Sequence, residues 1–487
     1  MKLKFLITLL FIPVFLSAQD ILNIEDCRQI ALQRNRKIKV ADENQQMMNS
    51  FYKAAKTQHY PRLGANGAYL RMNKEISLLS ENIFLPVIPQ EAITNGVINE
   101  IILGRNPDLL EQTLVLDENG NIMRDENGTP IFRNYAYLPA DQATLDLDNI
   151  FVFNVSMKQP IYMGGKIREI NKMARYGEDL FKAKKSITKT EVILETDQRY
   201  WQVISLQEKV KLTTIYKRMI EILIADLYNI YDEGIITNNE VLKAKVKYNE
   251  VNLKLLKATN GLRLAQMALN QTLGFPLDTI VQLSDSIIVN YRYQENNTLA
   301  NDAVQNRAEL NMLNSTIKIA ESAENIMRSR YLPNIGLSAN YLFMNPNPYN
   351  GFDNEFGGDW NVGVYVNIPI WHWNDKKHTL QATKHKTNAF RERLEEAEEL
   401  ITLEVKQTEF KYTESVKKVE LTHIALQQAK ENLDITQDSF DEGIINTTDL
   451  LEAQTMWQEA YSEYIEAKTE NKICESELLR ATGQLKY

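Results

Sequence analysis

The stretch that decides the fold reads YDEGIITNNEVLKA at residues 231–244, and it returns as FDEGIINTTDLLEA at residues 440–453. The two copies share, in the same order, an aromatic residue, two acids, a glycine and two isoleucines. A glycine that ends a helical pattern, followed by Asn or Thr and then an acid, is typical of a turn between two helices. The chain therefore contains the same helical hairpin twice, at an offset of 209 residues.

The repeat extends well beyond these turns. The same offset aligns the Pro-Ile-aromatic stretches at residues 160–162 and 369–371. A third matched pair, residues 60–64 and 332–336, has an offset of 272, so the first copy carries an insertion at about residues 74–149. Each copy reads as helix, strand, loop, strand, very long helix, turn and helix. One structural unit has been duplicated.

Very long helices lead into the two turns. Residues 375–441 contain no Gly or Pro, and residues 166–232 contain only Gly177. At a rise of 1.5 Å per residue, each segment forms a helix about 100 Å long. Apolar residues recur every three or four positions along residues 390–419 and 450–481, as they do in packed helical pairs. No compact globule accommodates such helices, so we expect an elongated fold.

Four shorter segments alternate between apolar and polar residues, at residues 63–72, 151–157, 335–343 and 360–368. Each is close to the length of a transmembrane β-strand, with one apolar face and aromatic residues near its ends. The alternative is a sheet packed on a soluble core, which is the usual setting of alternating strands. If the strands lie in lipid, four cannot close a barrel, so the chain must contribute them to a shared one.

Residues 1–19 favour the membrane alternative. Lys2 and Lys4 precede an apolar run at residues 5–16 and small residues at 17–18, a pattern typical of a cleaved signal peptide. The run is too short to span a bilayer as a helix. The rest of the chain has a formal net charge of −11, since the whole has −9 and loses two lysines, which argues against nucleic acid as a partner.

The two cysteines leave two alternatives open. In an oxidising compartment Cys27 and Cys474 could form a disulfide. Both also fall within helical patterns, where an unbridged cysteine is commonly a small buried apolar residue.

Three features occur together in this chain: the opening at residues 24–32, the PIYMGGK stretch at residues 160–166 and the doubled turn. In these features the chain resembles the TolC family of outer-membrane efflux proteins, and the resemblance covers residues 20–487. It implies a homotrimer in which each chain gives four strands to a 12-stranded barrel, continued by a coiled-coil tunnel of α-helices. It also implies passive export, with cargo arriving from an inner-membrane RND or ABC transporter through a periplasmic adaptor, and outer-membrane lipid around the barrel.

The expected fold is therefore mostly α with membrane β and an internal two-fold repeat. After the signal peptide, residues 20–487 form one elongated channel protomer. The first repeat covers about residues 20–275, the second covers about residues 300–487, and an equatorial linker joins them at about residues 275–299. The insertion at about residues 74–149 is an extracellular loop by this topology.

The resemblance places both helical turns at the periplasmic tip. There, two glycines and the isoleucine pairs after them become docking points for the adaptor's own helical hairpins: Gly234, Ile235, Ile236, Gly443, Ile444 and Ile445. The alternative is that these isoleucines close the turn internally.

Asp449 and Glu452 lie three residues apart and share one helix face. Without the resemblance this would be an ordinary solvated face. The resemblance makes them a ring of carboxylates at the periplasmic entrance, which favours cations. Glu240 is the first-repeat equivalent of Asp449, whereas Lys243 replaces the equivalent of Glu452.

The entrance lacks one residue that some members of the family use to hold it shut. They carry an Arg where this chain has Ile445. Apolar contacts of Tyr231, Phe440 and the isoleucines are the candidates for closure here.

The change from strand to helix is predicted at Pro160, Gly164 and Gly165 in the first repeat and at Pro369 in the second, where the usual glycines are missing. His378 and His385 are two helical turns apart, too far to share a metal ion, so no metal or other cofactor is expected. No catalytic motif is present, and we expect no enzyme. Asn-Gly at residues 119–120 and 127–128 suggests type I′ turns in the insertion.

Two functions from different classes remain. The first is a trimeric exit channel. The second is a soluble periplasmic coiled-coil adaptor or structural spacer, which explains the long helices but not four strands of membrane length.

Overall fold

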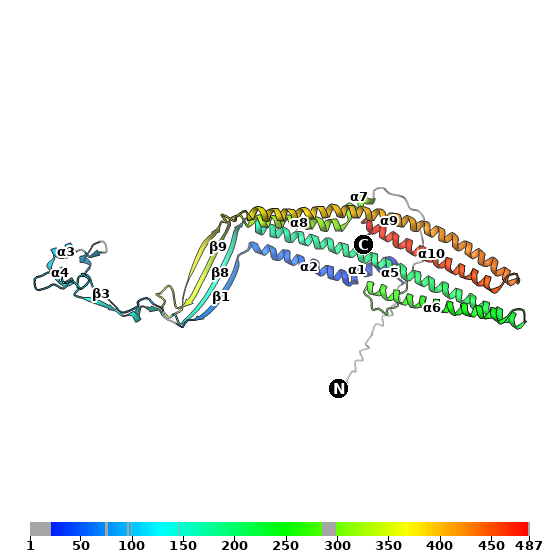
Figure 1. Ribbon diagram of the computed structural model, residues 1–487, viewed down its shortest axis with the longest axis horizontal. Coiled ribbons are helices and arrows are strands. Elements are labelled where there is room, and N and C mark those ends of the chain that lie inside the picture. The colour runs from blue at the N-terminus through cyan, green and yellow to red at the C-terminus, as the bar shows by residue number, and fades with distance from the viewer. Residues whose placement is uncertain are drawn as a thin grey trace, which may run out of the picture. The chain divides into compact units, whose positions relative to one another are not determined.

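The computed structural model divides into two units, each described separately below (Figure 1). The helical unit comprises Met1–Thr57, Gly165–Tyr331 and Trp371–Tyr487, and the sheet unit comprises Gln58–Gly164 and Leu332–Ile370. The predicted signal peptide lies outside the described residues. Those residues are 21–73, 76–94, 97–98, 100–145, 147–284 and 299–485.

The helical unit contains the long helices at the predicted positions. Two of them, α5 (Lys166–Asp232) and α9 (Asp375–Asp441), have 67 residues each. The others are α1 (Ile24–Arg34), α2 (Arg36–Lys56), α6 (Asn238–Leu273), α7 (Leu299–Asn306), α8 (Ala308–Ser329) and α10 (Thr447–Ala481). Among the described residues, no helix is both long enough and apolar enough to cross a membrane.

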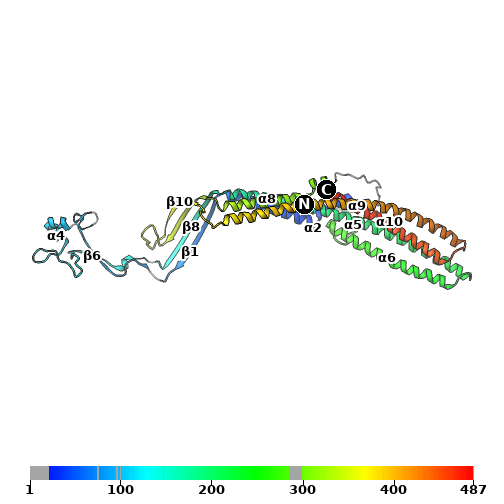
Figure 2. The same ribbon diagram turned by 45° about the horizontal axis from the view of Figure 1, so that its top comes forward.

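The helices form two rows that share α5 and α9 (Figures 1 and 2). Toward the strand-bearing ends of α5 and α9 the row is α2, α5, α8, α9. Toward their turns the row is α6, α5, α10, α9. The second repeat therefore packs on the first through α5, and α9 stands at one end of both rows.

Apolar clusters hold each hairpin together. One cluster joins Tyr200 and Trp201 of α5 to Leu269 of α6 and Cys27 of α1. On α9, the predicted stripe buries Ile401, Val405, Tyr412 and Val419. Cys27 and Cys474 are both buried and form no disulfide, so the buried-thiol alternative is the one observed.

The sheet unit confirms the four predicted strands. They are β1 (Arg62–Arg71), β8 (Asn149–Met163), β9 (Asn334–Asn345) and β10 (Gly357–Asn367), and they form one antiparallel sheet in the order β1-β8-β9-β10. A bulge interrupts the pairing of β8 with β9 between Pro160 and Tyr162. β1 and β10 are the two edges, and the strand order repeats the order of the helices α2, α5, α8 and α9 to which the strands connect.

The register gives this sheet one apolar and one polar face. Val155 of β8 pairs with Tyr341 of β9, which pairs with Trp360 of β10. On the other face Asn340 pairs with Asn361, and its side-chain amide donates to the Asn361 amide oxygen at 3.0 Å. Most side chains of β1 and β10 are exposed on both faces. Within one chain the sheet covers no core.

The insertion between β1 and β8 has a small core of its own. Ala92, Leu103, Leu114 and Phe132 are its buried residues. Its elements are β2 (Ile76–Ser77), β3 (Ile83–Pro86), β4 (Ile93–Thr94), β5 (Val97–Ile98), α3 (Glu100–Arg105), α4 (Pro107–Thr113), β6 (Tyr135–Leu138) and β7 (Thr144–Leu145).

The prediction of type I′ turns in this insertion is wrong. A type I′ turn needs a positive φ at both central residues, whereas in the first turn only Gly120 has one, at +79°. The Asp117 carboxylate instead accepts hydrogen bonds from the backbone N–H groups of Asn119 at 2.9 Å and Asn121 at 2.8 Å. These bonds stabilise an ordinary turn followed by a left-handed glycine.

Candidate functional site

The first tip turn closes α5 with a left-handed glycine. Gly234 has φ +75°, and its N–H donates to the carbonyl of Tyr231 at 2.8 Å. The N–H of Ile235 reaches back to the carbonyl of Ile230 at 3.2 Å. This pair of bonds is a Schellman motif, which satisfies the last carbonyls of a helix.

The second tip turn repeats this geometry. Gly443 also has φ +75°, and its N–H donates to Phe440 at 2.9 Å while that of Ile444 donates to Ser439 at 2.9 Å. Asn446 then caps α10, since its side-chain oxygen accepts from the N–H groups of Thr448 at 2.8 Å and Asp449 at 3.1 Å.

The two isoleucines of each tip turn differ in exposure. Ile235 and Ile444 are each 70% exposed. Ile236 packs against the apolar cluster formed by α5, α6, α9 and α10, and Ile445 is half-buried. The first isoleucine of each pair is therefore available to a partner, whereas Ile236 closes its own turn.

The two aromatic residues before the turns also differ. Phe440 packs against the apolar cluster that contains Tyr216 and Leu450. Tyr231 is 40% exposed and is not part of that cluster. Within one chain, the structure does not gather Tyr231 and Phe440 into a single apolar contact.

The predicted acidic residues fall into two groups. Asp449 and Glu452 are exposed on the same face of the first turns of α10. Glu240 differs, because its carboxylate accepts a hydrogen bond from the Lys243 amine at 2.9 Å and its side chain is only 21% exposed. Its other oxygen, Oε2, is buried without a hydrogen-bond partner among the described residues.

Lys243 is a tip residue whose contacts we did not predict. Its amine also lies 3.2 Å from the Thr448 hydroxyl, so it links α6 of the first repeat to α10 of the second. The signal was present in the sequence, because Lys243 stands where the second repeat has Glu452. Because the second repeat has Glu452 at this position, it cannot make the contacts of the Lys243 amine.

Both repeats change from strand to helix through the same backbone turn. Gly164 and Gly165 have φ +60° and +83° immediately before α5. Their equivalents before α9, Trp373 and Asn374, have φ +45° and +64°. The turn is thus retained in the second repeat without glycine. Pro160 lies at the bulge of β8, and Pro369 follows the end of β10.

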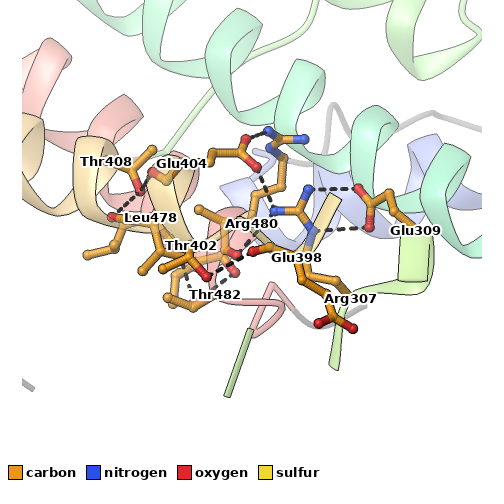
Figure 3. A network of polar contacts seen from close by, with 12 residues as sticks. Arg307, Glu309, Glu398, Thr402, Glu404, Thr408, Leu478, Arg480 and Thr482 are labelled. Atoms are coloured by element: carbon orange, nitrogen blue, oxygen red, sulfur yellow. Dashed lines mark hydrogen bonds and ion pairs between the residues drawn. The ribbon is translucent and has the colours of Figure 1, made fainter. Parts of the chain in front are cut away.

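A buried arginine organises the second junction, the corner where α7 meets α8 (Figure 3). Arg307 is 7% exposed and donates to the Glu309 carboxylate through Nε at 3.0 Å and Nη2 at 2.8 Å. Its Nη1 donates to Glu404 at 2.9 Å and to the Ala481 carbonyl at 3.1 Å. Arg480 pairs with the same Glu404. Sequence reasoning missed this cluster, because its members are dispersed along the chain.

Burial disfavours the charged forms of Arg307 and Glu309, but their hydrogen bonds and opposite charges have the larger effect on both pKa values. Desolvation works against the Arg307 guanidinium, yet the hydrogen bonds and charges of Glu309 and Glu404 raise the pKa of Arg307. Burial likewise disfavours the Glu309 carboxylate, while its hydrogen bond with Arg307 lowers the pKa of Glu309 below its usual value.

The first junction, where α1 meets α2, is the counterpart in the first repeat. The Asn35 side-chain amide donates to the Thr272 carbonyl at 2.8 Å, and Lys37 pairs with Glu195 at 2.7 Å. Asn35 corresponds to Arg307, and Thr272 corresponds to Ala481. The duplication thus extends to individual hydrogen bonds.

Among the described residues, no group of three His, Cys, Asp or Glu side chains could hold a metal ion.

Comparison with known proteins decides the family of one repeat. The family described as "Outer membrane efflux protein" matches residues 299–484. The second repeat is an outer membrane efflux protein domain. The first repeat shares its plan, as the matched turns, strands and junctions demonstrate. A search of curated proteins finds no sequence match to the chain.

Solved outer-membrane proteins have the fold of nearly the whole chain. The Campylobacter jejuni channel CmeC is 14% identical with a TM-score of 0.70, over 96% of this chain and 87% of that one. The open-state Neisseria gonorrhoeae channel MtrE is 15% identical with a TM-score of 0.69, over 95% and 90%. Vibrio cholerae VceC is 14% identical with a TM-score of 0.67, over 94% and 96%. The chain therefore shares the fold of these solved structures along nearly its full length.

Proposed function

We propose that the chain is one subunit of a homotrimeric outer-membrane channel that passively exports cargo. The cargo arrives from an inner-membrane RND or ABC transporter through a periplasmic adaptor. The chain catalyses no reaction, and the trimer extends from the outer membrane into the periplasm.

One observation carries this proposal: equivalent positions of α5 and α9 differ in exposure. Trp201 and Leu212 of α5 are 7% and 2% exposed, whereas their equivalents Phe410 and Leu421 of α9 are 75% and 67% exposed. The helix α5 contacts α10 of the second repeat, and Lys472 of α10 lies against the Trp201 ring. The exposed apolar face of α9 requires a helix of the same kind to cover it. The first repeat of another copy of the chain can supply that helix.

The contacts between α5 and α10 indicate what covers such a face. The Lys472 amine lies 5.9 Å from the centre of the Trp201 ring, and the Tyr216 hydroxyl lies 3.0 Å from that of Thr455. By the repeat offset, Arg263 corresponds to Lys472 and Phe410 to Trp201. We therefore expect Arg263 on α6 of the next copy to cover Phe410.

The sheet supports the same assembly. β1 and β10 each pair with one strand only within the described residues, so each leaves an open edge. In the proposed assembly, α9 of one copy meets α2 and α6 of the next copy. Pairing β10 of the first copy with β1 of the next copy would join the two sheets in the same direction. A contact of two different surfaces closes into a ring when its rotation allows, and three copies follow from the TolC resemblance.

The ring has the surfaces that a channel needs. The apolar face of the sheet fits lipid, and the polar face fits a water-filled lumen.

The helical unit supplies the residues of the periplasmic entrance. Asp449 and Glu452 form the entrance ring, and Glu240, held by Lys243, lies behind it. Tyr231 and Phe440 are the closure candidates, and the Pro160, Gly164, Gly165 and Pro369 segments turn strand into helix. The docking surface for the adaptor comprises the two tip turns, with Ile235 and Ile444 outermost and Gly234, Gly443, Ile236 and Ile445 supporting them.

A soluble adaptor or spacer remains the alternative. A sheet with no core under either face disfavours it, because such a sheet would expose its apolar face to water. Membrane fractionation separates the two functions, since a spacer would be recovered in the soluble periplasmic fraction.

The mass of the purified protein in detergent tests the trimer. We expect three chains per particle by light scattering. Phe410→Asp with Leu421→Asp should release monomers. Ile435→Asp is the matched control: Ile435 is 60% exposed on the same helix, but its equivalent Asp226 is also exposed on α5. A monomeric wild-type protein, or equal effects of the test and control variants, would contradict the proposal.

A further inference from the structure

The structure contains a cavity at the second junction, and each of its walls has an equivalent in the other repeat. This cavity of about 340 Å³ lies between α5 and the second junction. Ser186, Ile187 and Thr190 of α5 form one wall, and residues 306–309 form the other. Within one chain, the wall on α5 carries no charged residue.

The two corners that form such cavities have the same shape. A Cβ atom at Gly274 would lie 2.9 Å from the Arg34 carbonyl oxygen, and one at Gly483 would lie 2.9 Å from Asn306 Cβ. Arg34 corresponds to Asn306, just as Gly274 corresponds to Gly483. Both corners therefore pack against the end of their return helix in the same way.

The face of α9 that corresponds to the α5 wall is acidic. The equivalents of Ser186, Ile187 and Thr190 are Glu395, Glu396 and Glu399. All three glutamates are exposed, while the α5 residues are half-buried. None of the three has an ion-pair partner in the part of the chain that the structure describes.

The corner that would face this wall is basic. Its residues include Arg34, Arg36 and Lys37, which are all exposed. The Arg34 guanidinium lies 5.3 Å from the centre of the Phe275 ring, and Lys37 pairs with Glu195. Arg36 makes no ion pair within the described residues. The acidic face of α9 and the basic corner where α1 meets α2 thus lie at opposite ends of the row α2, α5, α8, α9.

We infer that Glu395, Glu396 and Glu399 of one copy bind Arg34 and Arg36 of the next copy, so that an ionic contact joins the subunits at their junctions. The inference rests on the proposed trimer. The partner is a second copy of this chain, chosen because the repeat offset and the charges both match. The contact also fixes the direction of assembly, since two acidic edges or two basic edges repel each other.

Charge reversal tests this contact. Glu396→Lys with Glu399→Lys, or Arg34→Glu with Arg36→Glu, should raise the apparent dissociation constant of the trimer about tenfold or more. Combining all four changes should restore assembly. Glu118→Lys with Glu126→Lys is the control for the glutamate reversal, because it makes the same change in net charge at exposed residues of the insertion.

Crosslinking gives an independent readout. Glu399→Cys with Arg36→Cys should yield covalent dimers and trimers with a short thiol-specific crosslinker. Thr190→Cys with Ala308→Cys lines the cavity within one chain and should yield crosslinked monomers. Native thiols do not interfere, since Cys27 is fully buried and burial raises the pKa of Cys474 to about 11.

The outcomes separate this inference from the proposed trimer. A monomeric wild-type protein overturns both. A wild-type trimer that withstands both reversals, or whose combined variant stays dissociated, overturns the ionic contact and leaves the trimer intact. Reversals that weaken assembly, with rescue by the combination, support it.

Discussion

The two junctions solve one problem with different chemistry. At each, a side chain at the start of a helix donates to the last turn of the return helix: Asn35 to the Thr272 carbonyl and Arg307 to the Ala481 carbonyl. Asn35 is neutral, whereas Arg307 is a buried charge held by Glu309 and Glu404. Duplication therefore preserved the geometry, while the charge of the donating side chain differs between the repeats.

The largest expected effect follows from removing the buried charge. Arg307→Ala leaves Glu309 without its partner and the Ala481 carbonyl without its donor, which should destabilise the helical unit by about 3 kcal/mol. Asn35→Ala, at the matched position, should cost about 1–2 kcal/mol. Urea unfolding followed by circular dichroism measures both. Equal losses would mean that the ionic cluster adds nothing beyond the shared hydrogen bond.

The pH dependence of stability distinguishes the junctions further. The pKa of Glu309 is lower in the folded state, because its hydrogen bond with Arg307 outweighs burial. Glu309 therefore stabilises the fold above its unfolded-state pKa, and this contribution is lost as the pH falls through the folded-state pKa. The stability difference between wild type and Glu309→Gln should shrink below about pH 4.5. A constant difference across this range would exclude the ionised carboxylate as its source.

The tips differ in charge at one matched position, where Lys243 corresponds to Glu452, and this difference predicts a change in conduction. Lys243→Glu gives the first repeat the acidic pair of the second, so the entrance of the proposed channel should prefer cations more strongly. Asp449→Asn with Glu452→Gln should lower that preference. Reversal potentials in planar bilayers under a salt gradient measure both. Unchanged selectivity in both variants would remove the carboxylate ring from the entrance.

Local periodicity was enough to predict the architecture, but contacts between distant segments were not accessible in this way. The bounds of both 67-residue helices followed from Gly and Pro positions. Alternation located the four strands but not their ends, since β8 covers Asn149–Met163 whereas the predicted segment was 151–157. The partial burial of Ile236 beside an exposed Ile235 depends on how α5, α6, α9 and α10 pack, which no local pattern records. The Arg307 cluster joins residues from three helices or their ends, so only the folded chain reveals it.

The smallest expected effect concerns the strand-to-helix turns. Asn374 has φ +64°, a conformation that costs an L-residue free energy and that Gly165 adopts freely at the matched position. Asn374→Gly should therefore stabilise the second repeat by about 0.5 kcal/mol, since the greater freedom of glycine in the unfolded chain offsets part of the gain. Gly165→Asn should cost a similar amount, because no atom lies within 4 Å of the new Cβ and the backbone alone decides the sign. Thermal unfolding of the two variants should shift in opposite directions. Shifts of the same sign would mean that the two turns, despite their shared dihedral angles, are not held by the same balance of forces.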